Sequence, residues 1–247
     1  MLSKAEVKII ASLKLKKNRQ ESGQFVVEGE KTVEEALAAG WNCQRLLIRQ
    51  GHATKLHASS ALLQHAYEEV TAETMERLTQ LSSASPVLGV FEQQEVAWQW
   101  KAGDPNFVLV LDQLRDPGNL GTIIRIADWF GLAGIWCSDD SVELWNSKTI
   151  QASMGSIFRV PVRYGDKLEF VQTEKRERIF ATVLGGTDLR QTPFGDGGLI
   201  LIGSESFGLS NALIDSASHK ISIPSFGKAE SLNAAVATGI VCSQLRL

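Results

Sequence analysis

The chain has 247 residues, of which 44% are hydrophobic and 21% are charged, and its formal net charge is −3. This composition is ordinary for globular domains and excludes a protein that coats nucleic acid over its whole surface. The sequence contains no run of about 18 apolar residues, so we expect no membrane-spanning segment.

The first 93 residues alternate between helix and strand patterns, which predicts a small α/β domain. We expect helices at residues 2–18, 31–40, 54–65 and 72–82, and strands at residues 24–30, 43–49, 66–71 and 85–93. Residues 94–106 contain turn-forming residues and show little periodicity, so they are predicted to be a linker.

Residues 107–247 repeat a strand–helix order, which predicts a second α/β domain. We expect strands at 107–114, 134–140, 158–165, 179–186, 199–205 and 220–225, and helices at 116–131, 146–153, 166–176, 209–215 and from 231 onward. Strands such as FVLVLD and LILIG are apolar on both faces, as in a parallel sheet covered by helices. Ligands of such sheets bind at the carboxyl ends of the strands, where this chain has loops rich in Gly, Ser, Asn and acidic residues.

The cysteines and histidines give two further expectations. Cys43, Cys137 and Cys242 are far apart and odd in number, which is typical of reduced core residues in a cytoplasmic protein. A lysine interrupts each short apolar run near the N-terminus, which argues against a secretory signal. The four histidines lack metal-ligand spacing, so no metal site is predicted.

The first 20 residues are basic although the whole chain is acidic. They carry six Lys or Arg residues and one Glu. Such a segment is typical either of a face that contacts phosphates or of a solvated helix face, and charge alone leaves both open.

The segment DPGNLGTIIRIADWFG, residues 116–131, combines a turn, a helix start and one arginine. Pro117 and Gly118 predict the turn, and Asn119 is the expected N-cap of the helix. Arg125 lies one turn after Gly121, and a helical glycine costs about 1 kcal/mol relative to Ala. That cost is explained if a ligand approaches the backbone under Arg125; the alternative is an ion pair between Arg125 and Asp128.

Two later segments place polar residues at the same edge of the predicted sheet. Gly203 and Glu205 follow a buried strand, where the carboxylate could accept ligand hydrogen bonds or pair with Arg125. Ser231 is the expected cap of the last helix, which leaves Asn233 at a mildly unfavourable position inside that helix.

Three segments, DPGNLGTIIRIADWFG, LILIGSESFGLS and ISIPSFGKAESLNAAVATGI, resemble in order and spacing the motifs of the SpoU (TrmH-type) RNA ribose methyltransferases of the SPOUT class. The segment IQASMGSIFRVP is similar to the family's connecting Ser–Gly segment. Residues 12–40 look like the start of the family's accessory RNA-binding domain. The resemblance implies an α/β fold whose C-terminal trefoil-knot domain, residues 107–247, has a mainly parallel sheet. The linker at 94–106 and the accessory domain at 1–93 precede it.

The resemblance also implies a cofactor and a site. S-adenosylmethionine would be held, largely by backbone groups, at Leu184, Gly185, Gly203, Ile223 and Leu232. The matching catalytic residues are Arg125, Asn119, Glu205, Ser231 and Asn233. The chain departs from the family pattern at Ser206, Ser225 and Ala234, where Gly, Met and Val are usual. These positions lie beside the adenosine pocket that the resemblance implies, so the differences are expected to affect cofactor affinity more than reaction type.

The reaction implied is transfer of a methyl group to a ribose 2′-oxygen, which only RNA offers. Arg125 is expected to hold a phosphate and to stabilise the alkoxide that develops on the 2′-oxygen. It is not expected to act as an ordinary base, because a guanidinium stays protonated and has no acceptor atom. The expected phosphate contacts of the accessory domain are Lys14, Lys16, Lys17 and Arg19.

Ribosomal RNA is favoured over transfer RNA because an accessory domain precedes the catalytic one, and the resemblance implies a homodimer formed through the knotted domain. A transfer-RNA ribose methyltransferase and a non-catalytic RNA-binding or ribosome-assembly protein stay open as alternatives. A dinucleotide-dependent oxidoreductase is disfavoured, since DPGNLG is not a G-x-G-x-x-G motif.

Overall fold

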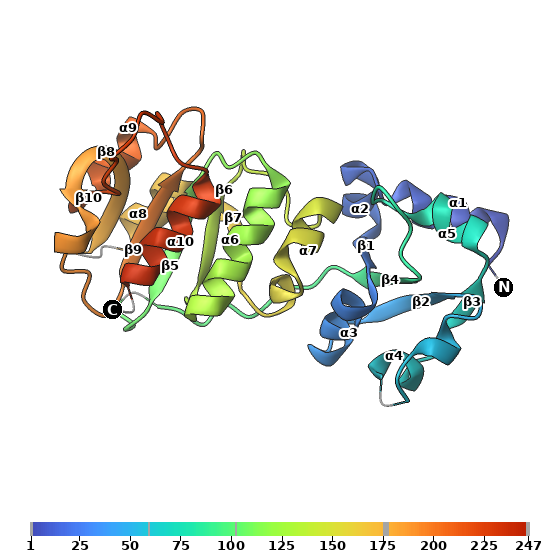
Figure 1. Cartoon of the computed structure of the whole chain (residues 1–247). Coiled ribbons are helices and arrows are strands. Elements are labelled where there is room, and N and C mark those ends of the chain that lie inside the picture. Colours follow the sequence, from blue (N-terminus) through green and yellow to red (C-terminus); the bar gives the residue numbers. More distant parts are fainter. Residues whose placement is uncertain (1, 59, 102, 175–177, 246–247) are drawn as a thin grey trace. The chain divides into compact units, whose positions relative to one another are not determined.

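The computed structural model describes residues 2–58, 60–101, 103–174 and 178–245. Within these residues, no helix is both long enough and apolar enough to cross a membrane. The chain forms two compact units, drawn in Figure 1. The first comprises Met1–Glu95 with Trp145–Arg159, and the second comprises Val96–Leu144 with Val160–Leu247.

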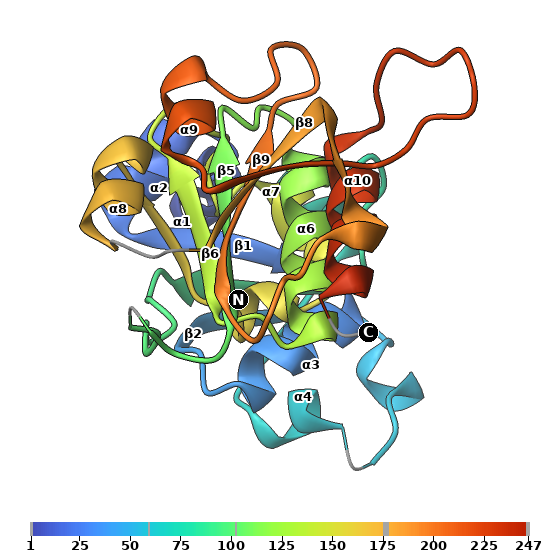
Figure 2. The same cartoon turned by 90° about the vertical axis from the view of Figure 1, so that its left-hand side faces the viewer.

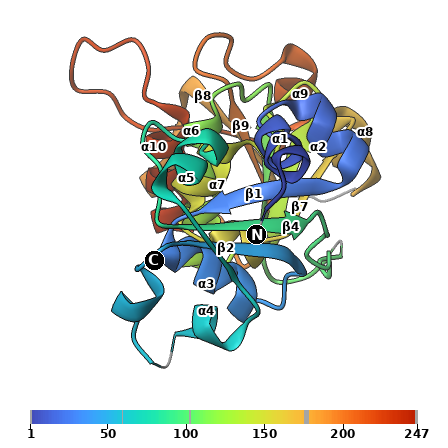
Figure 3. The ribbon, with the colours of Figure 1, turned by 90° about the vertical axis from the view of Figure 1, so that its right-hand side faces the viewer.

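The first unit has a four-stranded sheet in the order β1-β4-β2-β3. Its strands are β1 (Gln24–Glu28), β2 (Cys43–Arg49), β3 (Glu68–Val70) and β4 (Val87–Glu92). Its first helices are α1 (Lys4–Ser12), α2 (Lys16–Ser22), α3 (Glu30–Ala38), α4 (Ala61–Gln64) and α5 (Ala72–Leu78). Figure 3 shows α1 and α5 on one side of this sheet and α3 on the other. Apolar residues of α1 and α5 pack with Val26, Leu47 and Leu88 of the strands to form one core.

The prediction of a single helix at 2–18 is wrong, because α1 ends at Ser12 and a second helix, α2, begins at Lys16. The Arg19 guanidinium donates hydrogen bonds to the carbonyl oxygens of Leu13 (2.6 Å) and Lys14 (2.8 Å). The Asn18 side chain donates to the Ser12 carbonyl at 2.8 Å. These carbonyls belong to the last residue of α1 and to the two residues after it, so the two side chains stabilise the termination of the helix. The helix predicted at 54–65 is likewise replaced by a 3₁₀ turn, η1 (Ala53–Lys55), and the short α4.

A later segment, Trp145–Arg159, belongs to the first unit. It contains α7 (Ser147–Ser153) and a 3₁₀ turn, η2 (Ser156–Phe158). The Trp145 ring stacks on Phe25 with centroids 4.3 Å apart and meets the edge of Trp41 at 5.3 Å. The Trp41 indole N–H donates to the Phe158 carbonyl at 3.2 Å. An aromatic cluster therefore ties residues 145–159 to the N-terminal sheet.

The second unit has a six-stranded sheet in the order β10-β8-β9-β5-β6-β7. Its strands are β5 (Phe107–Asp112), β6 (Gly134–Ser138), β7 (Val162–Gly165), β8 (Ile179–Asp188), β9 (Gly198–Gly203) and β10 (His219–Ser222). Its helices are α6 (Pro117–Phe130), α8 (Lys167–Thr173), α9 (Asn211–Ser216) and α10 (Ala234–Gln244), with the 3₁₀ turn η3 at Leu189–Gln191. Every neighbouring pair of strands is parallel, which confirms the predicted fold class.

Helices cover both faces of this sheet. Figure 2 shows α6 and α10 side by side on one face and α8 and α9 on the other. Val108, Val110 and Leu201 point into the core under α8 and α9, as expected for strands buried on both faces. After β10, the chain crosses β8 and β9 in Figure 2 before it enters α10, which contacts β9, η3 and α6.

Part of the segment predicted to be a linker is packed against the second unit. The Trp100 side chain is buried in the core of that unit. The Trp98 ring meets Trp136 of β6 and Phe170 of α8, both with centroids 6.1 Å apart. Of the predicted linker, only the residues up to Glu95 belong to the first unit, so little free chain separates the two units in sequence. The domain boundaries at 93 and 107 stay predictions.

Candidate active site

Three loops of the second unit are joined by a chain of side-chain hydrogen bonds. The Asn119 amide of α6 donates to the carboxylate of Glu205, which follows β9. The Asn233 amide, just before α10, donates to the Asn119 side-chain oxygen at 2.9 Å. The structure therefore brings together one predicted catalytic residue from each of the three motif segments, at the carboxyl edge of the sheet.

The helix caps at this edge differ from the predicted ones. Asp116, not Asn119, is the N-cap of α6, and its carboxylate accepts from the Asn119 backbone N–H at 2.7 Å. Asn233, not Ser231, is the N-cap of α10, and its side-chain oxygen accepts from the Ala235 and Val236 N–H groups. Asp, Asn and Ser are all strong N-caps, so sequence propensity permitted both choices in each segment. The Asn119 side chain is left to bind Glu205, and Asn233 is not a strained interior residue.

Arg125 lies on an exposed part of α6, two turns after the helix start. Among the described residues, none forms a hydrogen bond or ion pair with its guanidinium, so the alternative pairing with Asp128 is not found. Gly121, one turn before Arg125, is buried in α6. Arg125 is therefore a charge that the fold leaves available to a ligand.

Ser231 is exposed in the loop that leads to α10. It forms no hydrogen bond with any residue that the structure describes, so the hydrogen-bonded chain does not include it.

The predicted cofactor residues begin with a bulge in β8. The pairing of β8 with β10 shifts between Ala181, which is opposite Lys220, and Thr187, which is opposite Ile221. Residues 182–186 therefore bulge away from the ladder. The Leu184 side chain on this bulge is 80% exposed, and Gly185 has φ +73° with open space where a side chain would lie.

The remaining predicted cofactor residues lie on neighbouring loops. Gly203 ends β9, and a Cβ there would come within 2.2 Å of the Gly208 carbonyl carbon, so only glycine allows this turn. Ile223 follows β10, and Leu232, which is 45% exposed, precedes α10. Exposed leucines beside open backbone suit adenine, which has apolar faces and a hydrogen-bonding edge, so the residues present fit S-adenosylmethionine.

A cavity of about 370 Å³ opens beside the bulge, and Gly185, Gly186 and Ile221 contribute to its lining. Its size is that of small-ligand sites. Of the predicted cofactor residues only Gly185 lines it, so it does not by itself define the cofactor site.

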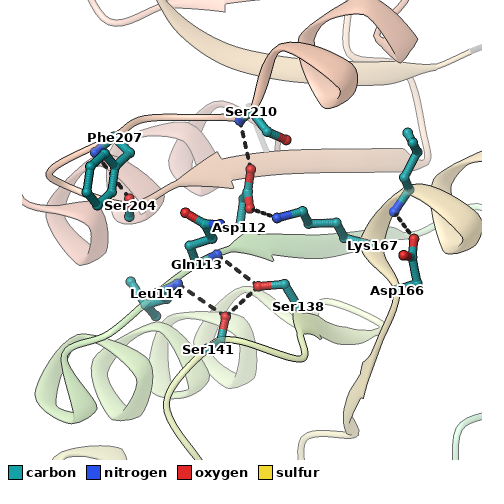
Figure 4. Close-up of polar contacts among 11 residues, drawn as sticks. Asp112, Gln113, Leu114, Ser138, Ser141, Asp166, Lys167, Ser204, Phe207 and Ser210 are labelled. Atoms are coloured by element: carbon teal, nitrogen blue, oxygen red, sulfur yellow. Dashed lines mark hydrogen bonds and ion pairs between the residues drawn. The ribbon is translucent and has the colours of Figure 1, made fainter.

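Sequence reasoning missed a buried ion pair below the site, shown in Figure 4. Asp112 ends β5 and is 1% exposed; its carboxylate binds the Lys167 ammonium and accepts from the Ser210 N–H at 2.8 Å. The available signal was a carboxylate at the end of the apolar run FVLVLD. Because Ser210 closes the loop that carries Glu205, Asp112 anchors one end of that loop.

The next two residues of the β5–α6 loop are held separately. Gln113 has φ +55°, and its N–H donates to the Ser138 hydroxyl at 2.9 Å. The Leu114 N–H donates to the Ser141 hydroxyl at 3.2 Å, and the two hydroxyls lie 2.9 Å apart. Figure 4 shows these bonds, which fix Gln113 and Leu114 in the loop that follows β5.

In the first unit, three of the four predicted phosphate contacts are exposed: Lys14, Lys16 and Lys17. Arg19 is 4% exposed and its donors are directed at backbone carbonyls. The prediction that Arg19 binds RNA is therefore wrong, and it instead stabilises the turn that displays the lysines. No cluster of three metal-ligating side chains occurs among the described residues of either unit.

Residues 106–243 match the model of the SpoU rRNA Methylase family. The chain belongs to this family. Residues 4–89 match the MRM3-like substrate binding domain. The SpoU motifs thus coincide with the loops joined by Asn119, Glu205 and Asn233.

Relatives align over nearly the whole chain of this SpoU protein. The 23S rRNA (guanosine(2553)-2′-O)-methyltransferase RlmP of Bacillus subtilis is 29% identical, over 98% of this chain and 96% of its own. The 23S rRNA (uridine(2479)-2′-O)-methyltransferase of Streptomyces viridochromogenes is 32% identical, over 92% of this chain and 84% of its own. The AdoMet-bound rRNA methyltransferase of Sinorhizobium meliloti superposes with a TM-score of 0.86 at 32% identity, covering 100% of this chain and 95% of the other.

Proposed function

We propose that this SpoU protein is an S-adenosylmethionine-dependent ribose 2′-O-methyltransferase of ribosomal RNA. The observation that carries the proposal is the hydrogen-bonded chain of Glu205, Asn119 and Asn233, which joins the three family motifs at one edge of the sheet. Family membership and the two ribosomal-RNA relatives support the reaction and the substrate class.

The extent of the matches favours ribosomal over transfer RNA. The relatives that act on 23S rRNA align through the substrate-binding unit as well as the catalytic one. A structure solved for 2-OH methylation of C/U34 on tRNA covers only 58% of this chain. The N-terminal unit is therefore shared with the ribosomal-RNA enzymes, and we assign it the task of holding the RNA.

The residues that hold the cofactor in this proposal are Leu184, Gly185, Gly203, Ile223 and Leu232. When bound, S-adenosylmethionine supplies an electrophilic methyl group on a sulfonium. The two leucines exclude water from the adenine faces, and the glycines let backbone groups reach its edge. Ser206 and Ser225, which replace the family's usual residues, lie exposed on two of these loops.

Arg125 acts on the RNA in this proposal. Its five N–H donors hold the phosphate beside the target ribose and stabilise the negative charge that develops on the 2′-oxygen. Asn119 and Asn233 orient Glu205 through the bonds described above, and Ser231, which is exposed on the last loop, binds the RNA directly in this proposal. Lys14, Lys16 and Lys17 bind phosphates farther along the RNA, so affinity falls with rising salt.

We also propose that the protein is a homodimer formed through α6 and α10 and that it works in the cytoplasm. Helix α10 is apolar around most of its circumference, and Val236 stays 52% exposed. A helix of this kind is normally covered on all sides, which supports a second subunit over it. The three cysteines are free, which suits a reducing compartment.

The test is methyl transfer from tritiated S-adenosylmethionine to unmodified 23S rRNA transcript, with the site mapped as a position resistant to alkaline cleavage. We expect one resistant ribose per transcript. Transfer to tRNA but not to rRNA would support the transfer-RNA alternative. No heat on calorimetric titration with S-adenosylmethionine would support the non-catalytic one.

A further inference from the structure

The loop after β9 is a tight hairpin with a fixed shape. Ser204 and Gly208 form a bridge, in which the Gly208 N–H donates to the Ser204 carbonyl at 2.9 Å. The Phe207 N–H donates to the Ser204 hydroxyl at 3.3 Å. Gly208 has φ +65°, and Gly203 packs against it without room for a Cβ. Glu205 and Phe207 are therefore held at the tip of the hairpin, as Figure 4 shows for Phe207.

Two side chains of this tip contact the loop that leads to α6. Glu205 accepts from Asn119, as described above. The Phe207 ring lies under the Arg115 guanidinium, whose central carbon is 5.5 Å from the ring centroid. Arg115 directly precedes the N-cap Asp116, so the same short loop positions Arg115 and Asn119. The Phe207–Arg115 pair thus lies next to the proposed catalytic chain.

Both members of the pair have surface left for a ligand. The Phe207 side chain is 68% exposed. Arg115 is exposed and forms no hydrogen bond or ion pair with any described residue. Its N–H donors are therefore available to a ligand while its plane covers part of the ring.

Exposed apolar side chains gather at this edge of the second unit. Its large exposed hydrophobic residues, within the described part, are Trp129, Leu184, Phe207, Phe226, Leu232 and Val236. Leu184 lies on the bulge of β8 and Val236 in the first turn of α10, whereas Phe207, Phe226 and Leu232 lie in the loops that follow β9 and β10. Leu184 and Leu232 are assigned above to the cofactor and Val236 to the proposed dimer, so Phe207 and Phe226 are the two exposed aromatic side chains of this group that have no assigned ligand.

We propose that Phe207 and Arg115 form a platform for one unpaired nucleotide of the RNA, next to the nucleotide that is methylated. The base stacks on the Phe207 ring, and Arg115 binds the adjacent phosphate. This chemistry matches the pair, since RNA in single-stranded regions presents a flat base and an anionic phosphate within one nucleotide. The proposal rests on the proposed function, because it takes the substrate to be RNA.

The test compares Phe207→Leu with Phe207→Tyr in the full chain, using unmodified 23S rRNA transcript and tritiated S-adenosylmethionine. Leucine keeps apolar bulk but cannot stack, whereas tyrosine keeps the aromatic face. We expect Phe207→Leu to raise the KM for RNA about tenfold, a typical effect of losing one stacked base. Phe207→Tyr should stay within about twofold of wild type, and Arg115→Gln should resemble Phe207→Leu.

The dissociation constant for S-adenosylmethionine, measured by calorimetry, serves as the second readout and should be unchanged in every variant. An equal KM for RNA in Phe207→Leu and wild type would overturn the platform, as would a loss confined to cofactor affinity. Filter binding of the same transcript separates the two proposals. If the wild type binds RNA but transfers no methyl group, the proposed function fails, and weaker binding by Phe207→Leu still supports the platform.

Discussion

Arg125 is the residue whose role is most sharply testable. Among the described residues, no carboxylate pairs with its guanidinium, and Arg125 lies six residues after Asn119 on the same helix. We expect Arg125→Ala to lower kcat for methyl transfer by about 100-fold or more, the usual effect of removing a donor that stabilises developing negative charge. Methyl-transfer assays at saturating RNA measure this directly.

The control for Arg125→Ala is the affinity for S-adenosylmethionine, which should match wild type. Arg125→Lys keeps the charge but loses the paired donors and should recover only part of the rate. Turnover of Arg125→Ala close to wild type would remove Arg125 from the mechanism.

At the same scale, residue type alone could not separate functional from structural arginines. Both Arg19, in the polar segment KKNRQES, and Arg125, among apolar residues of α6, are predicted from the sequence to bind RNA phosphates. Arg19 is buried against the carbonyls at the end of α1, whereas Arg125 is exposed. The difference depends on where α1 ends, and that ending is itself stabilised by Arg19, so helical periodicity could not predict it.

At the scale of elements, Asp112 joins β5, the first turn of α8 and the residue before α9. Removing one member of a buried ion pair typically costs about 3 kcal/mol or more, because the remaining charge is left unpaired. We therefore expect Asp112→Asn to lower the free energy of unfolding by about that amount, measured by urea denaturation.

The double variant Asp112→Asn with Lys167→Met tests the cause of that loss. It also removes the Lys167 ammonium that Asp112→Asn leaves unpaired, so it should recover part of the lost free energy of unfolding. If the double variant is no more stable than Asp112→Asn alone, the unpaired charge is not the cause.

Helix α10 gives a second prediction at this scale. In a dimer packed through α6 and α10, Val236→Glu places a charge in an apolar contact without a partner, which is strongly unfavourable. We expect the variant to elute as a monomer in size-exclusion chromatography with light scattering, under conditions where wild type is dimeric. Lys148→Glu, an exposed change on α7, should leave the oligomer intact. A monomeric wild type would contradict the proposed dimer.

Most strands and helices could be predicted because they follow simple periods. The buried runs of β5 and β9 and the amphipathic face of α6 are clear in the sequence. The caps were less certain, since Asp116 and Asn119 are both acceptable N-caps and only the tertiary bond from Asn119 to Glu205 separates their roles. The β8 bulge that exposes Leu184 depends on pairing with β10, about 35 residues later, which no local pattern encodes. The expectation of a knotted topology rests on the family resemblance alone, since general connectivity rules disfavour a knot.

At the scale of the whole molecule, residues 145–159 lie far along the chain yet complete the N-terminal unit. The chain therefore passes between the two units after Glu95, after Leu144 and after Arg159. The pattern of strands and helices predicted the domains in simple succession. It had no means to show that Trp145 would stack on Phe25, because aromatic contacts across 120 residues leave no periodic signal.

This arrangement predicts that Trp145→Ala in the full chain destabilises the first unit selectively. The indole is half-buried and contacts two rings of the cluster, so we expect a loss of about 2 kcal/mol, below the usual cost for a fully buried Trp. Scanning calorimetry should show the transition of the first unit at a lower temperature. Affinity for S-adenosylmethionine, which is bound by the second unit in our proposal, should be retained. The control is Trp129→Ala, which should leave the transition of the first unit unchanged, since Trp129 lies on α6 of the second unit and makes no ring contact among the described residues. Identical first transitions for Trp145→Ala and wild type would mean that the aromatic cluster does not depend on residues 145–159 for its stability.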